Sequence, residues 1–385
     1  MDKVKILSVF GTRPEAIKMA PLILALREEQ NFNSSVVVTG QHRELLDQVL
    51  QHFAIVPDYD LDIMQQSQNL YDLTARILQG LETVLAQEKP AMVLVHGDTT
   101  TTFAGALAAY YQKIPVGHVE AGLRSFARYF PFPEEINRRL TGVLTDLHFA
   151  PTGTSRDNLL REGVRRERIL VTGNTAIDAL FITVKNSYQF RSPVLRRLDF
   201  QKQRIMVLEA HRRENWGKPL ADICCGVRDI VRKYPDVQVV FPVHPNPVVK
   251  EVAYKWLGAE SRVLLVSPLD YCDFANLMNR AYLILTDSGG IQEEAPALGK
   301  PVLVLRDVTE RPEAVAAGTV KIVGTKTADI VANVDMLLAD DKTYADMAQA
   351  VNPYGDGEAA RRIVAGLKHF FGFREEKPAE FCPKS

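Results

Sequence analysis

The sequence predicts an α/β fold built from two Rossmann-like, doubly wound parallel-sheet domains. Short apolar runs without alternation of polar and apolar residues, such as 4–10, alternate with longer amphipathic stretches, such as 15–29. Parallel strands that are covered on both faces have this character. The series begins again after residue 203, and a chain of 385 residues is long enough for two domains of ordinary size.

The predicted elements divide the chain into three parts. We place an N-terminal domain at residues 1–175 and a C-terminal domain at 176–356, and we expect the two to face a cleft. Residues 357–385 hold a last helical pattern, at about 358–371, which we expect to cross back to the first domain. The predicted strands are 4–10, 35–39, 91–95, 115–119 and 147–150 in the first domain, and 205–208, 238–243, 263–266, 283–286, 301–305 and 320–323 in the second.

Composition excludes several classes of function. The formal net charge of -1 argues against a nucleic-acid-binding protein, which needs a basic excess. The first apolar run, 4–10, is too short for a signal peptide or a membrane span. The cysteines have no zinc-site spacing and fit a reducing compartment. The four cysteines are Cys224, Cys225, Cys272 and Cys382. We therefore expect a cytoplasmic protein without a metal site.

A glycine turn after the strand at 283–286 is a candidate phosphate site. Ser288, Gly289 and Gly290 lead into a helix, whose N-terminus carries free N–H groups and partial positive charge. Glu294, one turn into this helix, could accept the hydroxyls of a ribose. The alternative is a tight strand–helix turn in which Ser288 is only the N-cap.

A second candidate clamp for a phosphate or a sugar is the turn at 11–14, which contains Arg13. Neither turn has the G-x-G-x-x-G spacing of dinucleotide-binding folds, and no such motif follows another strand. The sequence therefore argues against NAD-dependent chemistry, and we expect no cofactor.

Carboxylates follow several strands of the first domain. Asp98 and Glu120 come directly after predicted strands, and Glu134 and Glu135 open a helix after the loop 122–137. Acidic residues favour a first helical turn, so we assign Glu135 to that role and leave Glu134 open between a structural and a chemical role. Carboxylates that converge in a closed site can shift one another's pKa values, and one then acts as acid and another as base.

Taken together, the motifs resemble one family, the non-hydrolysing UDP-N-acetylglucosamine 2-epimerases, whose fold is similar to that of the GT-B glycosyltransferases. The resembling segments run in order through most of the chain. They are FGTRPEAIKMAPL (10–22), GQHREL (40–45), HGDTTTT (96–102), HVEAGLRS (118–125), PFPEEINRR (131–139), HRREN (211–215), PVHPNP (242–247), TDSGGIQEEAPALGKP (286–301) and TERPEA (309–314).

The resemblance implies an isomerase that interconverts UDP-N-acetylglucosamine and UDP-N-acetylmannosamine for surface polysaccharide synthesis. UDP would leave C1 as the C2 proton is removed, giving a bound 2-acetamidoglucal, and would then add back. The implied catalytic residues are Asp98, Glu120, Glu134 and His211, and the implied substrate-binding residues are Arg13, Lys18, Leu269, Phe274, Ser288, Gly289, Gly290, Glu294 and Arg311.

The resemblance also implies partners beyond one substrate molecule. Members of the family bind a second UDP-N-acetylglucosamine as an activator and form homodimers. The residues that match this allosteric site are Gln41, Glu44, Arg212 and His244.

Three alternatives remain open from the sequence. A hydrolysing epimerase would release UDP and free N-acetylmannosamine, using the same fold and many of the same motifs. A GT-B glycosyltransferase would need an acceptor and fewer acids near C2 than the segments 96–102 and 118–125 supply. A sugar-nucleotide sensor without activity has no support, because all the acids of the family pattern are present.

Overall fold

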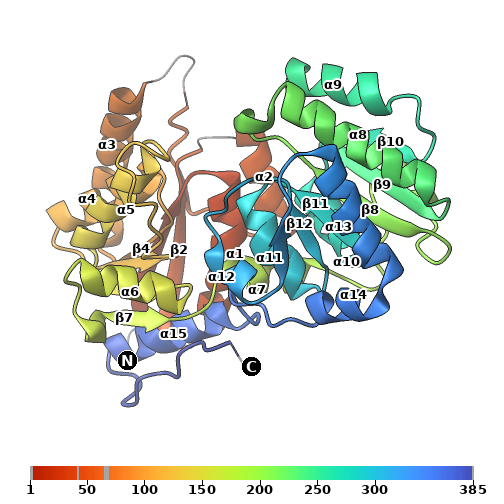
Figure 1. The fold of residues 1–385 in the computed structure, drawn as a ribbon. Helices are drawn as coiled ribbons and strands as arrows, with labels where there is room; N and C mark the ends of the chain where they lie inside the picture. The colour runs from red at the N-terminus through yellow and green to blue at the C-terminus, as the bar shows by residue number, and fades with distance from the viewer. Residues whose placement is uncertain (1–2, 41–42, 65–68, 384–385) are drawn as a thin grey trace. The chain divides into compact units, whose positions relative to one another are not determined.

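The structure is a computed structural model that describes residues 3–40, 43–64 and 69–383. It divides into two compact units, one formed by the chain up to Phe181 together with Tyr354–Cys382, and the other by Ile182–Pro353 (Figure 1). None of the helices in the described part of the chain is both long and apolar enough to cross a membrane.

The first unit contains a parallel sheet of seven strands in the order β3-β2-β1-β4-β5-β6-β7. Its strands are β1 (Val4–Phe10), β2 (Phe32–Val38), β3 (Tyr59–Asp60), β4 (Met92–His96), β5 (Val116–Val119), β6 (Leu147–Ala150) and β7 (Ile169–Val171). Its helices are α1 (Arg13–Glu28), α2 (Arg43–His52), α3 (Leu70–Glu88), α4 (Thr100–Tyr111), α5 (Glu134–Leu144), α6 (Gly153–Arg161), α7 (Thr175–Thr183, which runs into the second unit) and α15 (Ala359–Phe370).

The strands of this sheet are apolar on both faces because helices cover both. Val9 and Val95 point towards α3 and α4, where they join a core with Ile77 and Leu81. On the opposite face, α1 packs beside α2 and α15. Almost every residue of the central strands is therefore buried, which explains the continuous apolar runs in the sequence.

The second unit contains a parallel sheet of six strands in the order β10-β9-β8-β11-β12-β13. Its strands are β8 (Arg204–Glu209), β9 (Val237–Pro242), β10 (Val263–Val266), β11 (Leu283–Thr286), β12 (Val302–Val304) and β13 (Val320–Ile322). Its helices are α8 (Lys218–Lys233), α9 (Pro247–Leu257), α10 (Tyr271–Arg280), α11 (Gly289–Ala297), α12 (Pro312–Ala316), α13 (Thr327–Ala339) and α14 (Asp341–Ala348).

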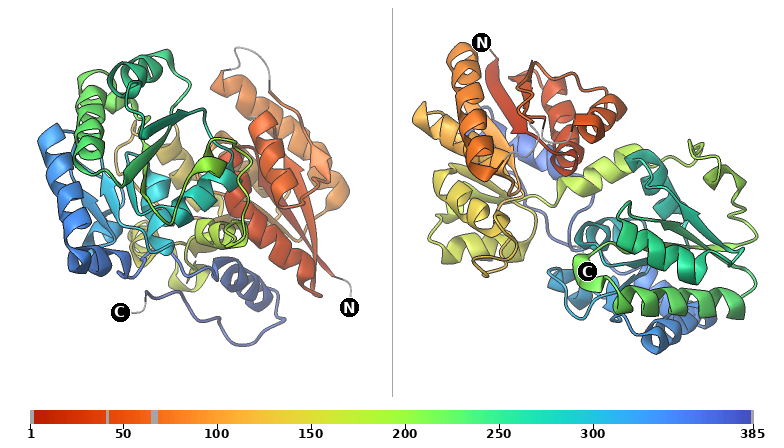
Figure 2. Two further views of the ribbon diagram at one scale, coloured as in Figure 1. Left: turned by 90° about the vertical axis from the view of Figure 1, so that its right-hand side faces the viewer. Right: turned by 90° about the horizontal axis from the view of Figure 1, so that it is seen from above.

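The helix α15 belongs to the first unit although it follows the second sheet in sequence (Figure 2). Asp178 on α7 holds its N-terminus, because its carboxylate accepts hydrogen bonds from the backbone N–H groups of Ala359 (3.2 Å) and Ala360 (2.8 Å). Near its other end, Lys368 forms an ion pair with Glu29. The predicted fold class is confirmed, including the helix that crosses back.

Both sheets are doubly wound, so the strand order reverses at one point in each. In the first unit this point lies between β1 and β4, and in the second between β8 and β11. Ligands of open α/β sheets bind beyond the carboxyl ends of the strands at such switch points. The residues that follow these four strands are therefore the first place to look for a site.

Candidate active site

The turn after β1 passes close to its neighbours and needs glycine. A Cβ atom on Gly11 would lie 2.0 Å from Oγ1 of Thr39 and 2.7 Å from Oγ1 of Thr101. Thr39 and Thr101 are themselves in hydrogen-bond contact at 2.9 Å. The next residue, Thr12, is the N-cap of α1 and forms a capping box with Glu15.

The buried carboxylate of Glu15 joins the turns after β1 and β4. Its side chain is 3% exposed. Oε2 accepts hydrogen bonds from the backbone N–H groups of Gly11 (3.0 Å) and Thr12 (2.8 Å), and Oε1 accepts one from the hydroxyl of Thr99 (2.6 Å). Burial raises the pKa of Glu15, while the hydrogen bond from Thr99 and those from the first turn lower it. Glu15 therefore clamps the two strand ends at the switch point.

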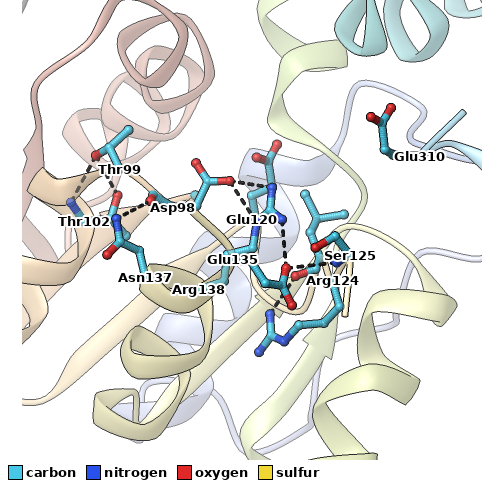
Figure 3. A network of polar contacts seen from close by, with 12 residues as sticks. Asp98, Thr99, Thr102, Glu120, Arg124, Ser125, Glu135, Asn137, Arg138 and Glu310 are labelled. Carbon is cyan, nitrogen blue, oxygen red and sulfur yellow. Dashed lines mark hydrogen bonds and ion pairs between the residues drawn. The ribbon is translucent and has the colours of Figure 1, made fainter. Parts of the chain in front are cut away.

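Asp98 lies at the end of β4 and is held by an arginine (Figure 3). Nε of Arg138 donates to Oδ2 of Asp98 at 2.8 Å, and a second guanidinium nitrogen lies 2.6 Å from the same oxygen. Arg138 also pairs with Glu135 at 3.2 Å. Glu135 in turn accepts hydrogen bonds from the backbone N–H groups of Ser125 (2.9 Å) and Phe126 (3.2 Å). Glu135 thus anchors the loop 122–137 in addition to opening α5.

Glu120 follows β5 in a left-handed backbone conformation, with φ of 62°. This conformation is uncommon for a residue other than glycine and occurs often at functional sites. The carboxylate pairs with Lys18 of α1 and accepts a hydrogen bond from Nδ2 of Asn174 at 3.0 Å. A Cβ atom on Gly97 would lie 3.6 Å from Oε1 of Glu120, so this carboxylate lies beside the turn that carries Asp98.

A neutral histidine accompanies Glu120. Nε2 of His96 lies 3.9 Å from Oε2 of Glu120. Burial lowers the pKa of His96 to about 3, and the negative charge of Glu120 opposes this only in part. His96 is therefore uncharged at neutral pH. Two further residues predicted in this unit are Arg13, which opens α1, and Glu134, which opens α5, and both are partly exposed.

In the second unit, a buried aspartate organises the loop after β8. Asp287 is 0% exposed. Its carboxylate accepts hydrogen bonds from the backbone N–H groups of His211 (3.1 Å) and Arg212 (3.0 Å) and from Nδ2 of Asn215 (2.9 Å). Burial, and then the charge of Glu209, raise the pKa of Asp287. Asp287 therefore joins the ends of β8 and β11, as Glu15 joins those of β1 and β4.

His211 lies against acidic groups. Its Nδ1 is 2.5 Å from Oε1 of Glu209 and 3.4 Å from Oδ1 of Asp287. Its ring stacks on that of His244, with centroids 6.1 Å apart. The contact with Glu209 is the main cause that raises the pKa of His211, and the charged imidazolium is favoured.

Glu209, His211 and Asp287 are the group of described residues whose ligand atoms lie close enough to share a metal ion. However, the 2.5 Å contact between His211 and Glu209 is that of a direct ion pair. Two ligands of one cation, each about 2.1 Å from it, would stand roughly 3 Å or more apart. The geometry therefore favours the ion pair.

The N-terminus of α11 carries a cluster of positive charge. A Cβ atom on Gly289 would lie 3.7 Å from Nη2 of Arg212 and 3.9 Å from the guanidinium of Arg311. Ser288 is the N-cap but makes no side-chain capping bond, and among the described residues Nε of Arg212 is buried without a hydrogen-bond partner. Arg311 pairs with Glu293. This arrangement suits an anion such as a phosphate.

The other predicted residues lie on several elements of the two units, apart from Gln41. Gly290 borders open space and Glu294 lies partly buried on α11. Leu269 lines a hollow of about 500 Å³ beyond β10, and Phe274 lies on α10, which follows it. Glu44 is exposed on α2, whereas Gln41 lies outside the described residues.

Sequence reasoning missed several partners in these clusters. Glu15 carried a signal, because Thr12-x-x-Glu15 is the sequence pattern of a capping box. Glu209 and Asp287 also stood at the ends of predicted strands, but their partners were not evident. Asn174 had no signal, since it follows β7, a strand of three residues that was not predicted.

The chain has two doubly wound parallel sheets. Acids follow the strands of one sheet, and an anion cradle follows those of the other. This combination defines the class of nucleotide-sugar enzymes with a GT-B-like fold. A family model for UDP-N-acetylglucosamine 2-epimerase matches residues 24–368. The chain is 55% identical over 384 residues to the UDP-N-acetylglucosamine 2-epimerase of Bacillus subtilis, with 100% of both chains covered.

It is 56% identical to the Escherichia coli K12 protein of the same name, over 95% of this chain and 99% of that one. The crystal structure of the Neisseria meningitidis UDP-GlcNAc 2-epimerase bound to UDP-GlcNAc is similar with a TM-score of 0.85, at 49% identity over 94% and 99% of the chains. The chain belongs to the UDP-N-acetylglucosamine 2-epimerase family, and the family predicted from its motifs is confirmed.

Replacement of Glu15 by glutamine tests the clamp between β1 and β4. One carboxylate oxygen would become an amide that faces hydrogen-bond donors, so we expect Glu15→Gln to lower the free energy of unfolding by about 1–3 kcal/mol. Urea titration measures this change. The control is Glu28→Gln at the exposed end of the same helix, for which we expect less than about 0.5 kcal/mol. Equal effects of the two substitutions would show that Glu15 is not a clamp.

Proposed function

We propose that this protein interconverts UDP-N-acetylglucosamine and UDP-N-acetylmannosamine by eliminating and re-adding UDP. The observation that carries the proposal is the pair of carboxylates, Asp98 and Glu120, at the ends of neighbouring strands in a member of this family. The full-length match to the bacterial relatives supports the non-hydrolysing reaction over the hydrolysing one and over glycosyl transfer.

The chemistry explains why several acids are needed. The proton on C2 of the sugar is not acidic, because no carbonyl group adjoins that carbon. Loss of UDP from C1 together with this proton gives 2-acetamidoglucal, and return of the proton on the other face, with UDP adding back at C1, gives the epimer. Removal and return of the proton require positioned acid and base groups, and the departing diphosphate requires positive charge.

We assign the proton transfers to Asp98 and Glu120, with Glu134 as the third acid at the sugar. Arg138 and Lys18 hold the first two carboxylates in place. This division of labour gives the N-terminal domain the catalytic carboxylates.

We assign the binding of the UDP moiety to the C-terminal domain. Its anion cradle at the start of α11 would hold the diphosphate, and His211 with Arg13 would stabilise it as it leaves. Glu294 would accept the ribose hydroxyls, and the uracil would lie at Leu269 and Phe274. The remaining assigned UDP contacts are Lys18, Ser288, Gly289, Gly290 and Arg311.

We propose that a second UDP-N-acetylglucosamine activates the enzyme through Arg212 and His244, together with Glu44 and Gln41. The cysteines, which have no zinc-site spacing in the sequence, support a cytoplasmic location, since they fit a reducing compartment.

Incubation with UDP-N-acetylglucosamine in D2O, without added cofactor, tests the reaction. We expect UDP-N-acetylmannosamine to form and deuterium to enter C2 of both epimers, which proton NMR detects. If a second molecule activates the enzyme, the initial rate should depend on the substrate concentration sigmoidally, with an upward curvature at low concentration.

Other outcomes of this assay would overturn the proposal. Accumulation of free N-acetylmannosamine and UDP at each turnover would identify a hydrolysing enzyme. No turnover without an acceptor would indicate a transferase. Retention of the original hydrogen at C2 would contradict proton exchange with solvent.

Replacement of the two acids tests their assignment. We expect Asp98→Asn and Glu120→Gln each to lower kcat by about 10²–10⁴-fold, because each removes a proton-transfer group. The affinity for UDP, measured by calorimetry, should stay within about threefold, since UDP binding is assigned elsewhere. The control is Asp157→Asn, at a half-exposed side chain, and this variant should retain its activity. Loss of UDP binding in both variants would identify nucleotide-binding or structural residues instead.

We also propose that the protein forms a homodimer through α4 and α5. These helices pack together in the first unit and expose Tyr110, Tyr111, Leu140 and Val143. Val143 is 85% exposed, which is unusual for an apolar side chain on a helix and is typical of a contact surface.

Sedimentation velocity tests the dimer. We expect twice the chain mass of 43.0 kDa for the natural protein and a shift towards the single chain for Val143→Glu, because a charge would be buried in the interface. Val56→Glu, at another exposed apolar residue, is the control and should remain dimeric. A single-chain mass for the natural protein would refute the dimer.

A further inference from the structure

The carboxylate of Glu209, at the end of β8, has a different partner on each oxygen. Oε1 lies 2.5 Å from Nδ1 of His211. Oε2 accepts a hydrogen bond from the hydroxyl of Thr286 at 2.8 Å, and this hydroxyl accepts one from the backbone N–H of Ser288 at 2.9 Å. Glu209 therefore contacts the imidazole of His211 as an ion pair and is connected to the N-cap of α11 by two successive hydrogen bonds.

We propose that Glu209 is a positioning residue for His211, which holds the imidazole by Nδ1 and leaves Nε2 to contact the bound anion. The link through Thr286 and Ser288 fixes the ring relative to the start of α11. The inference rests on the proposed function, in which His211 stabilises the departing diphosphate. None of the family motifs quoted above includes Glu209.

The charges around His211 single out Glu209. The acidic groups that face the ring are Glu209 from β8 and Asp287 from the turn after β11, and the basic neighbours are Arg212 and His244. Asp287 already accepts three backbone and amide donors and lies farther from Nδ1, at 3.4 Å.

The contact with Glu209 is the largest cause that raises the pKa of His211, and the negative charge of Glu209 adds to it. The effect extends to the stacked ring, since the pKa of His244 is lowered by burial and then by the charge of His211. Removal of the Glu209 charge would lower the pKa of His211, so less imidazolium would remain at pH 7–8 to face a diphosphate.

A purely structural role of Glu209 makes a different prediction. In that case the carboxylate only ties β8 to β11 through Thr286. Glu209→Gln separates the two roles, because the amide oxygen can still accept the hydrogen bond from Thr286 but the side chain carries no charge. Thr286→Val does the reverse, since it removes the hydrogen bond and keeps the charge beside His211.

The decisive measurement is the titration of His211, followed by NMR of the full chain with labelled histidine. The His211→Gln variant assigns the signal. We expect Glu209→Gln to lower the titration midpoint by about one pH unit or more, the usual effect of losing an opposite charge at this distance. The matched control is Glu214→Gln. Glu214 lies in the same loop as His211, but its charge pairs with Arg306, so the titration midpoint of His211 should not move.

The pH profile of the reaction gives the second readout. We expect the alkaline limb of kcat/KM to move to lower pH in Glu209→Gln by the same amount, so that the variant loses about tenfold at pH 8 and recovers to within about threefold at pH 6. In the His211→Gln background, Glu209→Gln should have no further effect, because Glu209 acts through His211.

An unchanged titration midpoint in folded Glu209→Gln protein would overturn the inference, as would a midpoint that shifts equally in Thr286→Val. The titration does not depend on turnover. If the protein does not epimerise UDP-N-acetylglucosamine but the midpoint shifts, the proposed function fails and the positioning role stands. Thermal unfolding of each variant identifies any loss of fold, and Glu209→Asp, which keeps the charge, should restore the midpoint at least in part.

Discussion

The two candidate clusters depend on one recurring interaction, a buried carboxylate that binds the backbone at the reversal point of a parallel sheet. Parallel strands bring their carboxyl ends together, but the turns that follow them leave N–H groups without partners. Glu15 supplies acceptors for the turns after β1 and β4, and Asp287, in the turn after β11, supplies them for the loop after β8. Burial of a charge is costly, and several donors for each carboxylate offset that cost.

These clamps leave neighbouring side chains free for chemistry. With the turn after β4 fixed by Glu15, Asp98 can pair with Arg138 on α5. Glu120 keeps a left-handed backbone conformation that costs about 1–3 kcal/mol in isolation. Its contacts with Lys18 and Asn174 help to hold it there. The strain is therefore supported by residues from two distant parts of the chain, and the carboxylate is fixed at the end of β5.

The sequence predicted the architecture well because the strands are apolar on both faces. The runs 4–10, 147–150, 263–266 and 283–286 match strands to the residue. The strands β3 and β7 were missed, since two or three residues are too few to form a pattern. The helix α1 begins two residues earlier than its apolar pattern, because the N-cap Thr12 sets its start.

The candidate residues were predictable by type but their partners were not. Asp98, Glu120 and His211 follow predicted strands, and this placement is visible in a linear pattern. The contact of Glu120 with Asn174 spans 54 residues, and that of Glu209 with Thr286 spans 77. Such contacts depend on the strand order, in which β8 lies beside β11, and a sequence pattern does not define this order.

The charged and polar side chains that have partners, and those that have none, indicate which unit is prepared to bind an anion. In the first unit the carboxylates of Asp98 and Glu120 pair with the cations Arg138 and Lys18. In the second unit, Nε of Arg212 is buried without a hydrogen-bond partner among the described residues, and Ser288 leaves the start of α11 without a side-chain cap. A buried donor without a partner costs about 1–3 kcal/mol, and a phosphate oxygen could recover that cost on binding. These two groups support the proposed placement of the diphosphate at the second unit, whereas the carboxylates of Asp98 and Glu120 are balanced by Arg138 and Lys18 and would repel an anion.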